Sequence, residues 1–146
     1  MTENNIKKKI GKKMIKEGEK RIIESGSIKK KGEKILKEKE IDVEKYETRI
    51  SEGDLIKKEA EKLIKQGKKI VQNDNRSEKE IGERNITMGK RLKKAGEQRA
   101  EDYEKELEKT EEWIEAGENL VEKSQEIKNA GKALKKYGKK LIQKSR

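Results

Sequence analysis

Small residues recur at every seventh position through most of this chain, and aliphatic residues flank them. Eleven of the twelve glycines fall on two seven-residue lattices, the second shifted by one residue, and only Gly26 lies off both. A residue repeated every seven positions stays on one face of a helix, because seven residues make nearly two turns. The pattern therefore predicts two long helices, each carrying a stripe of small residues.

The two lattices mirror each other about a point near the middle of the chain. When residues whose numbers add up to 149 are paired, glycine lies opposite glycine in five pairs. We call each pair of facing residues a rung. These pairs are Gly11 with Gly138, Gly18 with Gly131, Gly32 with Gly117, Gly53 with Gly96, and Gly67 with Gly82. Ser25 then meets Ser124 and Tyr46 meets Tyr103, whereas a tandem duplication would place Gly32 on Tyr103. Reflection describes the pattern better than duplication, and it predicts that the two helices are antiparallel.

The centre of the reflection falls in residues 73–76, the most turn-like stretch of the chain. Its sequence is Asn-Asp-Asn-Arg, and Asn and Asp favour turns because their side chains bond to nearby backbone. Ser77 and Glu80 follow with the spacing of a capping box, which marks the start of a new helix. We therefore predict an all-α fold with one domain over residues 1–146: a helix over 5–72, a turn over 73–77 and a helix over 78–144.

Close approach of the two backbones is the simplest reason for so many helical glycines. We name the lattice position d; the heptad positions a and g beside it are mostly aliphatic. Each glycine costs a helix about 1 kcal/mol relative to alanine. Tight contact along the line where the two helices meet, which we call the seam, must offset that cost. We expect a long coiled-coil-like hairpin that can pair into a four-helix bundle. Alternatively, breaks near Gly26 and Gly53 would give shorter helices.

One pair of tyrosines interrupts the series of small residues at position d, which we call the track. Tyr46 and Tyr103 occupy a rung where two rings cannot fit a seam sized for glycine, so the helices must spread or the rings must stack offset. The flanking positions are polar as well: Asp42, Arg49, Arg99 and Glu106. This region is either a weakly packed wedge of paired charges or a bend or docking point for a partner.

Composition narrows the class of protein. Charged residues make up 49% of the 146 residues and hydrophobic residues 28%, which excludes a thick globular core. Disorder is the competing interpretation, but a chain that need not pack has no reason to keep a seven-residue spacing. The absence of Cys and His removes disulfides, the usual zinc sites and histidine acid–base chemistry.

No catalytic constellation is evident, so we expect no enzyme activity, cofactor, metal or small-molecule substrate. The carboxylates fall on solvated helix faces among lysines, where we expect no shift in pKa. The Gly-Lys pairs lack the spacing of a phosphate-binding loop. The chain shows no apolar run long enough to cross a bilayer and no signal-peptide core, so we expect a cytoplasmic protein.

Positive charge is concentrated toward both ends of the chain. Residues 1–39 and residues 123–146 each carry a net charge of +8, whereas residues 40–122 carry −5. A hairpin brings the two basic segments together. The candidate residues for contact with an anionic partner are Lys7, Lys8, Lys12, Lys13, Lys135, Lys136, Lys139 and Lys140. The alternative is that these lysines form a solvated face that aids solubility.

These observations favour a non-enzymatic structural or protein-interaction role. We expect a rod-like helical hairpin that acts as a spacer, adaptor or assembly subunit and binds another helical protein or a second copy of itself. The alternative is a peripheral binder of anionic membrane or nucleic acid, acting through the basic end formed by both termini.

Overall fold

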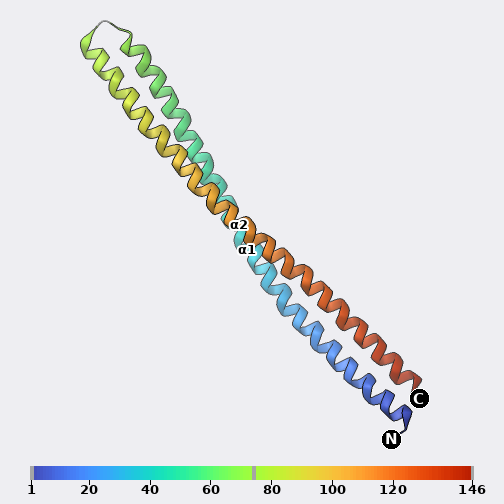
Figure 1. Ribbon diagram of the computed structural model, residues 1–146. Coiled ribbons are helices and arrows are strands. Elements are labelled where there is room, and N and C mark those ends of the chain that lie inside the picture. Colours follow the sequence, from blue (N-terminus) through green and yellow to red (C-terminus); the bar gives the residue numbers. More distant parts are fainter. Residues whose placement is uncertain (1, 74, 146) are drawn as a thin grey trace. The chain divides into compact units, whose positions relative to one another are not determined.

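Two helices account for nearly all of the protein. The computed structural model describes residues 2–73 and 75–145, in which α1 spans Glu3–Val71 and α2 spans Arg76–Lys144 (Figure 1). No strand occurs in these described ranges, and α1 and α2 pack against each other along their length. The predicted all-α helical hairpin is confirmed. Packing divides it into two compact units: unit 1 comprises residues 1–39 and 112–146, and unit 2 comprises residues 40–111.

The helix starts differ slightly from the prediction because other residues cap them. The Asn5 N–H donates to Thr2 Oγ1 at 3.3 Å, so α1 begins at Glu3 rather than at residue 5. The Ser77 N–H donates to Asn75 Oδ1 at 3.0 Å, so α2 begins at Arg76 rather than at residue 78. Expecting Ser77 to cap α2 was wrong: Asn75 satisfies a backbone donor that has no partner within the helix.

The first helix is continuous. Neither Gly26 nor Gly53 interrupts it, and no glycine in the described residues has a positive φ. The alternative of shorter helices is therefore wrong. Without proline, every residue after the first turn can donate its N–H to the preceding turn, and the energetic cost of glycine alone does not break the helix.

Glycine meets glycine across the seam of unit 1, in the pairs that reflection predicts. A Cβ atom built on Gly18 would lie 2.5 Å from the carbonyl oxygen of Gly131, and one built on Gly11 would lie 2.6 Å from that of Gly138. Real Cβ atoms do not approach a carbonyl oxygen this closely, so glycine is required.

Unit 2 repeats the same arrangement. A Cβ on Gly53 would lie 2.8 Å from the Gly96 carbonyl oxygen, and a Cβ on Gly67 would lie 2.6 Å from that of Gly82. Gly89 faces Ala60, whose carbonyl oxygen would lie 3.0 Å from an added Cβ. Both units therefore hold α1 and α2 antiparallel in one register.

Only small side chains are buried. Every buried position in the described residues is Gly, Ala, Ser or Thr. Ser25 and Ser124 each donate their hydroxyl to a carbonyl of their own helix, at 2.6 Å in both cases, and Thr110 does the same at 2.9 Å. Because these hydroxyls are satisfied within one helix, serine and threonine can replace glycine on the track without leaving an unpaired polar group.

The large aliphatic residues at positions a and g flank the seam and are mostly half-buried. Two of them are more exposed than their position suggests: Trp113 is 54% exposed and Leu92 is 43% exposed. The Lys39 Nζ lies 5.5 Å from the centroid of the Trp113 ring. This indole therefore packs under a lysine on the surface of unit 1 rather than closing over the seam.

Candidate interaction surfaces

The two sides of the seam differ in chemistry. Three ion pairs between the helices join a lysine at position a to a glutamate at position e: Lys57 to Glu97 at 3.8 Å, Lys93 to Glu61 at 3.6 Å, and Lys135 to Glu19 at 3.9 Å. The ion pair between Arg99 and Glu52, at 2.8 Å, joins positions g and c. Positions a and e of both helices thus share one side, and positions g and c share the other.

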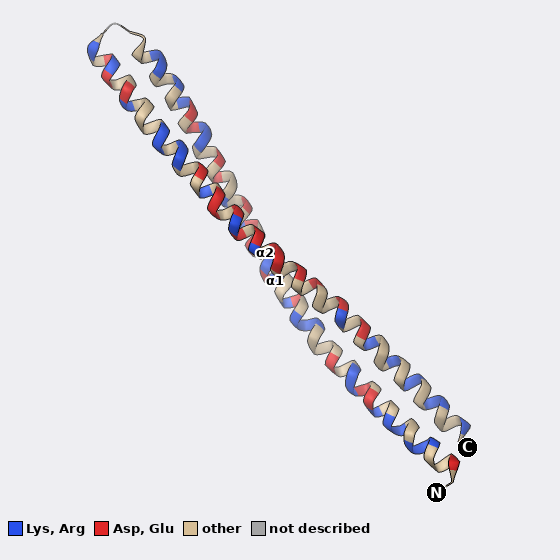
Figure 2. Cartoon of the chain, in the orientation of Figure 1, with Lys and Arg blue, Asp and Glu red and all other residues tan. Residues whose placement is uncertain are grey.

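The free end of unit 1 gathers the lysines contributed by both ends of the chain. The start of α1 lies beside the end of α2, because Gly11 contacts Gly138, and Lys and Arg dominate both segments (Figure 2). We call residues 2–19 and 130–145 the unit 1 end; it carries twelve lysines and three glutamates. The eight lysines singled out in the sequence all lie there, in close proximity only because the chain folds back.

These eight lysines do not share one face. By heptad position, five of them follow rows a, e and b: Lys8, Lys12, Lys135, Lys136 and Lys139. The other three, Lys7, Lys13 and Lys140, follow rows g and f on the opposite side. Lys135 packs its stem across the seam, since a Cβ on Gly18 would lie 2.8 Å from Lys135 Cγ. The a–e side therefore carries most of the lysines of the unit 1 end.

The g–c side of the unit 1 end also exposes large apolar residues. Ile6, Ile10 and Tyr137 are each about half exposed, at 46%, 47% and 57%. The Lys140 Nζ lies 5.6 Å from the centroid of the Tyr137 ring, within the range of a cation–π contact. Sequence reasoning missed Tyr137, which lies in row c with Ile10, one row beyond the aliphatic positions a and g.

Unit 2 carries a second apolar surface on its g–c side. Ile81, Met88 and Leu92 of α2 are 51%, 57% and 43% exposed. Beside them at position g of α1 lie three half-buried residues, Ile56, Leu63 and Ile70. We call these six residues the unit 2 strip. Ile81 and Met88 are seven residues apart, so a search for apolar repeats in row c would have found them.

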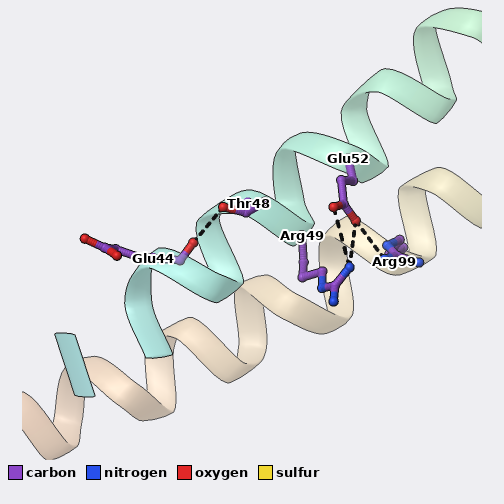
Figure 3. A network of polar contacts seen from close by, with 5 residues as sticks. All are labelled: Glu44, Thr48, Arg49, Glu52 and Arg99. Carbon is purple, nitrogen blue, oxygen red and sulfur yellow. Dashed lines mark hydrogen bonds and ion pairs between the residues drawn. The ribbon is translucent and has the colours of Figure 1, made fainter. Parts of the chain in front are cut away.

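A polar network lies at one end of the unit 2 strip. Glu52 accepts hydrogen bonds from Arg49 at 3.1 Å and from Arg99 at 2.8 Å, and Thr48 donates to the Glu44 carbonyl at 2.9 Å (Figure 3). The hydrogen bond from Arg49 lowers the pKa of Glu52 below its ordinary value of 4.5, with a smaller contribution from Arg99. The expectation that no carboxyl would be shifted was wrong here, because two guanidinium groups converge on one carboxylate.

This network leaves one donor unused. The Nε of Arg99 is buried and has no hydrogen-bond partner among the described residues. Arg99 also lines a hollow of about 540 Å³, together with Ile56, Ala95, Gln98, Asp102 and Tyr103. The hollow combines an apolar wall with the amide of Gln98 and the carboxylate of Asp102, beside the ion-paired guanidinium of Arg99.

The predicted tyrosine pair is present in unit 2. The rings of Tyr46 and Tyr103 have centroids 5.9 Å apart and are tilted by 32°, an offset arrangement rather than a face-to-face stack. Arg99 lies 5.8 Å from the Tyr103 ring. Arg49, Arg99 and Glu106 nearby are ion-paired, as the wedge interpretation expects. A role for the tyrosine pair as a bend or docking point stays a prediction.

Gly26 lies on the surface, off the seam. An added Cβ there would meet no atom within 4 Å. It lines a small hollow of about 140 Å³ with Ser25, Ser124, Lys29 and Lys128, among others. Because the position is open, Gly26 has no packing role comparable to that of the track glycines.

The described residues contain no group of three or more His, Cys, Asp or Glu arranged to hold a metal ion. Within the same part of the chain, neither helix has a stretch long and apolar enough to cross a membrane. The architecture defines an all-α helical hairpin with a seam of small residues. Comparison with protein-family models, with curated proteins and with solved structures finds no match for this chain.

Proposed function

We propose that this protein is a non-enzymatic helical hairpin that acts as an assembly subunit or adaptor, binding another helical protein and, in the simplest case, a second copy of itself. The observation that carries the proposal is the composition of the buried core. Its only buried hydrophobic residues are Ala60 and Ala100, and no large side chain in the described residues is fully buried.

A fold built this way keeps its large aliphatic residues available. Most aliphatic residues at positions a and g are only half-buried. Burying apolar surface stabilises a protein by about 25 cal/mol per Å². Docking a second helical pair would therefore supply stabilisation that the glycine seam alone does not, which is the logic of a four-helix bundle.

The unit 2 strip is the best candidate for this contact. Unit 2 contains 18 basic and 19 acidic residues, whereas unit 1 contains 23 basic and 11 acidic residues. Two copies of unit 2 can approach each other with almost no net repulsion, but two copies of unit 1 cannot.

Sedimentation equilibrium tests this proposal. The wild-type protein is expected to sediment as a dimer or larger species whose population rises with concentration. Replacing Met88 and Leu92 together with Glu should weaken association by about a hundredfold, because two apolar side chains would lose their burial and gain charge. Circular dichroism would check that the double variant remains helical.

Ile23→Glu provides the matched control. Ile23 is the most exposed of the large hydrophobic residues, at 75%, and it lies in unit 1 in row b, away from the unit 2 strip. This variant should associate like the wild type. A wild-type chain that stays monomeric at every concentration, or an Ile23→Glu variant as weak as the double variant, would contradict the proposal.

A further inference from the structure

The unit 1 end combines apolar crests with dense positive charge. On its g–c side, Ile6 and Ile10 project from α1 and Tyr137 projects from α2, all about half exposed. Residues at positions c and f lie on the outer, convex surface of each helix, which we call its crest. Residues at position g border the groove between the two helices. The most exposed apolar side chains therefore stand on the crests, at nearly the same level along the unit.

Charged residues border these apolar side chains. Lys7, Lys13, Lys140 and Lys144 lie in rows g, f and c on the same side, with Glu3 and Glu17 in row c. Glu3 is ion-paired with Lys7 at 3.4 Å, and the Lys140 Nζ lies over the Tyr137 ring. The whole unit 1 end carries a net charge of +9, from twelve lysines and three glutamates. Lysine can keep its stem on an apolar surface while its ammonium group reaches an anionic layer.

We propose that the g–c side of the unit 1 end docks onto an anionic lipid bilayer, with Ile6, Ile10 and Tyr137 entering the interfacial region and the lysines meeting lipid headgroups. Amphipathic helices bind such surfaces through buried apolar area together with attraction to anionic lipids. Each lysine near the surface strengthens binding about fivefold. The docking surface lies in unit 1, so it is separate from the unit 2 strip.

The position of the apolar residues favours a bilayer over a helical partner. A single helix would lie in the groove along row g, where Met14 and Leu134 are already half-buried. It would leave Ile10 and Tyr137 uncovered on the two crests. A bilayer is broad and deformable, so it contacts both crests at once.

The same residues disfavour nucleic acid as the partner. A phosphate backbone is bound by charge alone, and the most crowded lysines lie on the opposite, a–e side, among them Lys8, Lys12, Lys136 and Lys139. Exposed Ile6 and Ile10 would contribute nothing to such a complex. Nucleic-acid binding therefore predicts dependence on the a–e side, whereas bilayer docking predicts dependence on the g–c side.

Vesicle cosedimentation distinguishes these outcomes. The full chain should bind mixed phosphatidylcholine–phosphatidylserine vesicles, should not bind phosphatidylcholine vesicles, and should bind more weakly as salt increases. Replacing Ile10 and Tyr137 together with Ser should lower the partition coefficient at least about tenfold, because apolar contact is lost while charge is unchanged. Ile23→Ser, at an exposed isoleucine of the same unit on the other side, should leave the partition coefficient unchanged.

Three results would overturn the proposal. The first is retention of the wild-type protein on duplex DNA at the same salt, lost only with Lys8→Gln and Lys136→Gln and without vesicle binding, which would point to nucleic acid. Binding of the Ile10 and Tyr137 variant equal to wild type would show that charge alone acts. Failure of the wild-type chain to bind the anionic vesicles would rule out the docking surface directly.

Discussion

Two neighbouring rungs of unit 2 occupy the same lattice and pack in opposite ways. At Gly53 and Gly96 the backbones touch, and an added Cβ on Gly53 would lie 2.8 Å from the Gly96 carbonyl oxygen. At Tyr46 and Tyr103 the two rings contact each other with centroids 5.9 Å apart. The track therefore alternates between backbone contact and side-chain contact without losing register.

The comparison shows which rungs tolerate change. A glycine rung has no space for a side chain, so any substitution must move a backbone. The tyrosine rung is half-buried and its neighbours are charged, so a substitution there can be absorbed by rotamer changes and solvent. Register is thus held by the glycine rungs, and the tyrosine rung only has to be compatible with it.

The largest expected effect is that of a bulky residue on the track. A Cβ on Gly32 would lie 2.8 Å from both the Gly117 carbonyl oxygen and Val121 Cγ2, whereas the three nearest atoms to a Cβ on Gly117 lie at 3.2 Å. Gly32→Leu should lower the free energy of unfolding by about 3 kcal/mol, with a smaller loss for Gly117→Leu. Tyr46→Leu should cost about 1 kcal/mol or less. Urea denaturation followed by circular dichroism measures all three, and equal losses would mean that the seam is not closely packed.

A methyl group should give effects of opposite sign at two glycines of α1. Gly53→Ala should destabilise the protein by about 1–2 kcal/mol, since the new Cβ meets the backbone of α2. Gly26→Ala should stabilise it by about 1 kcal/mol, because the position is open and alanine favours helix. Thermal unfolding of the two single variants compares them directly. If Gly53→Ala stabilised the protein, glycines of the track would not differ in packing from Gly26, which lies outside it.

The smallest expected effect concerns the ion-paired neighbours of the tyrosine rung. The folded-state pKa of Glu52 is lowered below 4.5 by the hydrogen bond from Arg49. Its contribution to stability is therefore fully present above pH 4.5 and is lost as the pH falls through the folded-state pKa. Glu52→Gln should lower the melting temperature slightly at neutral pH, and this difference should vanish in acid. A difference in melting temperature that persists unchanged into acid would contradict this role of Glu52.

Much of the fold could be predicted because the repeat itself is a packing rule. A seven-residue spacing fixes one helix face, and small residues on that face require close contact with another helix. The interruptions of the track, such as Ser25 opposite Ser124, then select a single antiparallel register. The start of α2 was less predictable, because Asn75 and Ser77 are both good capping residues and only the path of the turn decides which one caps.

The candidate surfaces were predicted only in part. The lysines of the unit 1 end could be named from the sequence, because a hairpin must bring the two basic segments together. The exposed residues of row c, such as Met88 and Tyr137, were missed because the aliphatic stripe was taken to end at position g. The pairing of Arg99 with Glu52 joins residues 47 positions apart, which no local pattern reveals.

The sequence by itself determined the helices, their antiparallel pairing and the register of the seam, because period and side-chain size leave one solution. Tertiary structure decided which rows share a side. Along one helix the seven-residue period already places a beside e and g beside c. The packing of the two helices decides that a and e of α1 lie on the same side as a and e of α2. That choice separates the lysine-rich side of unit 1 from the side carrying Ile10 and Tyr137, because the side on which a residue lies depends on both helices at once.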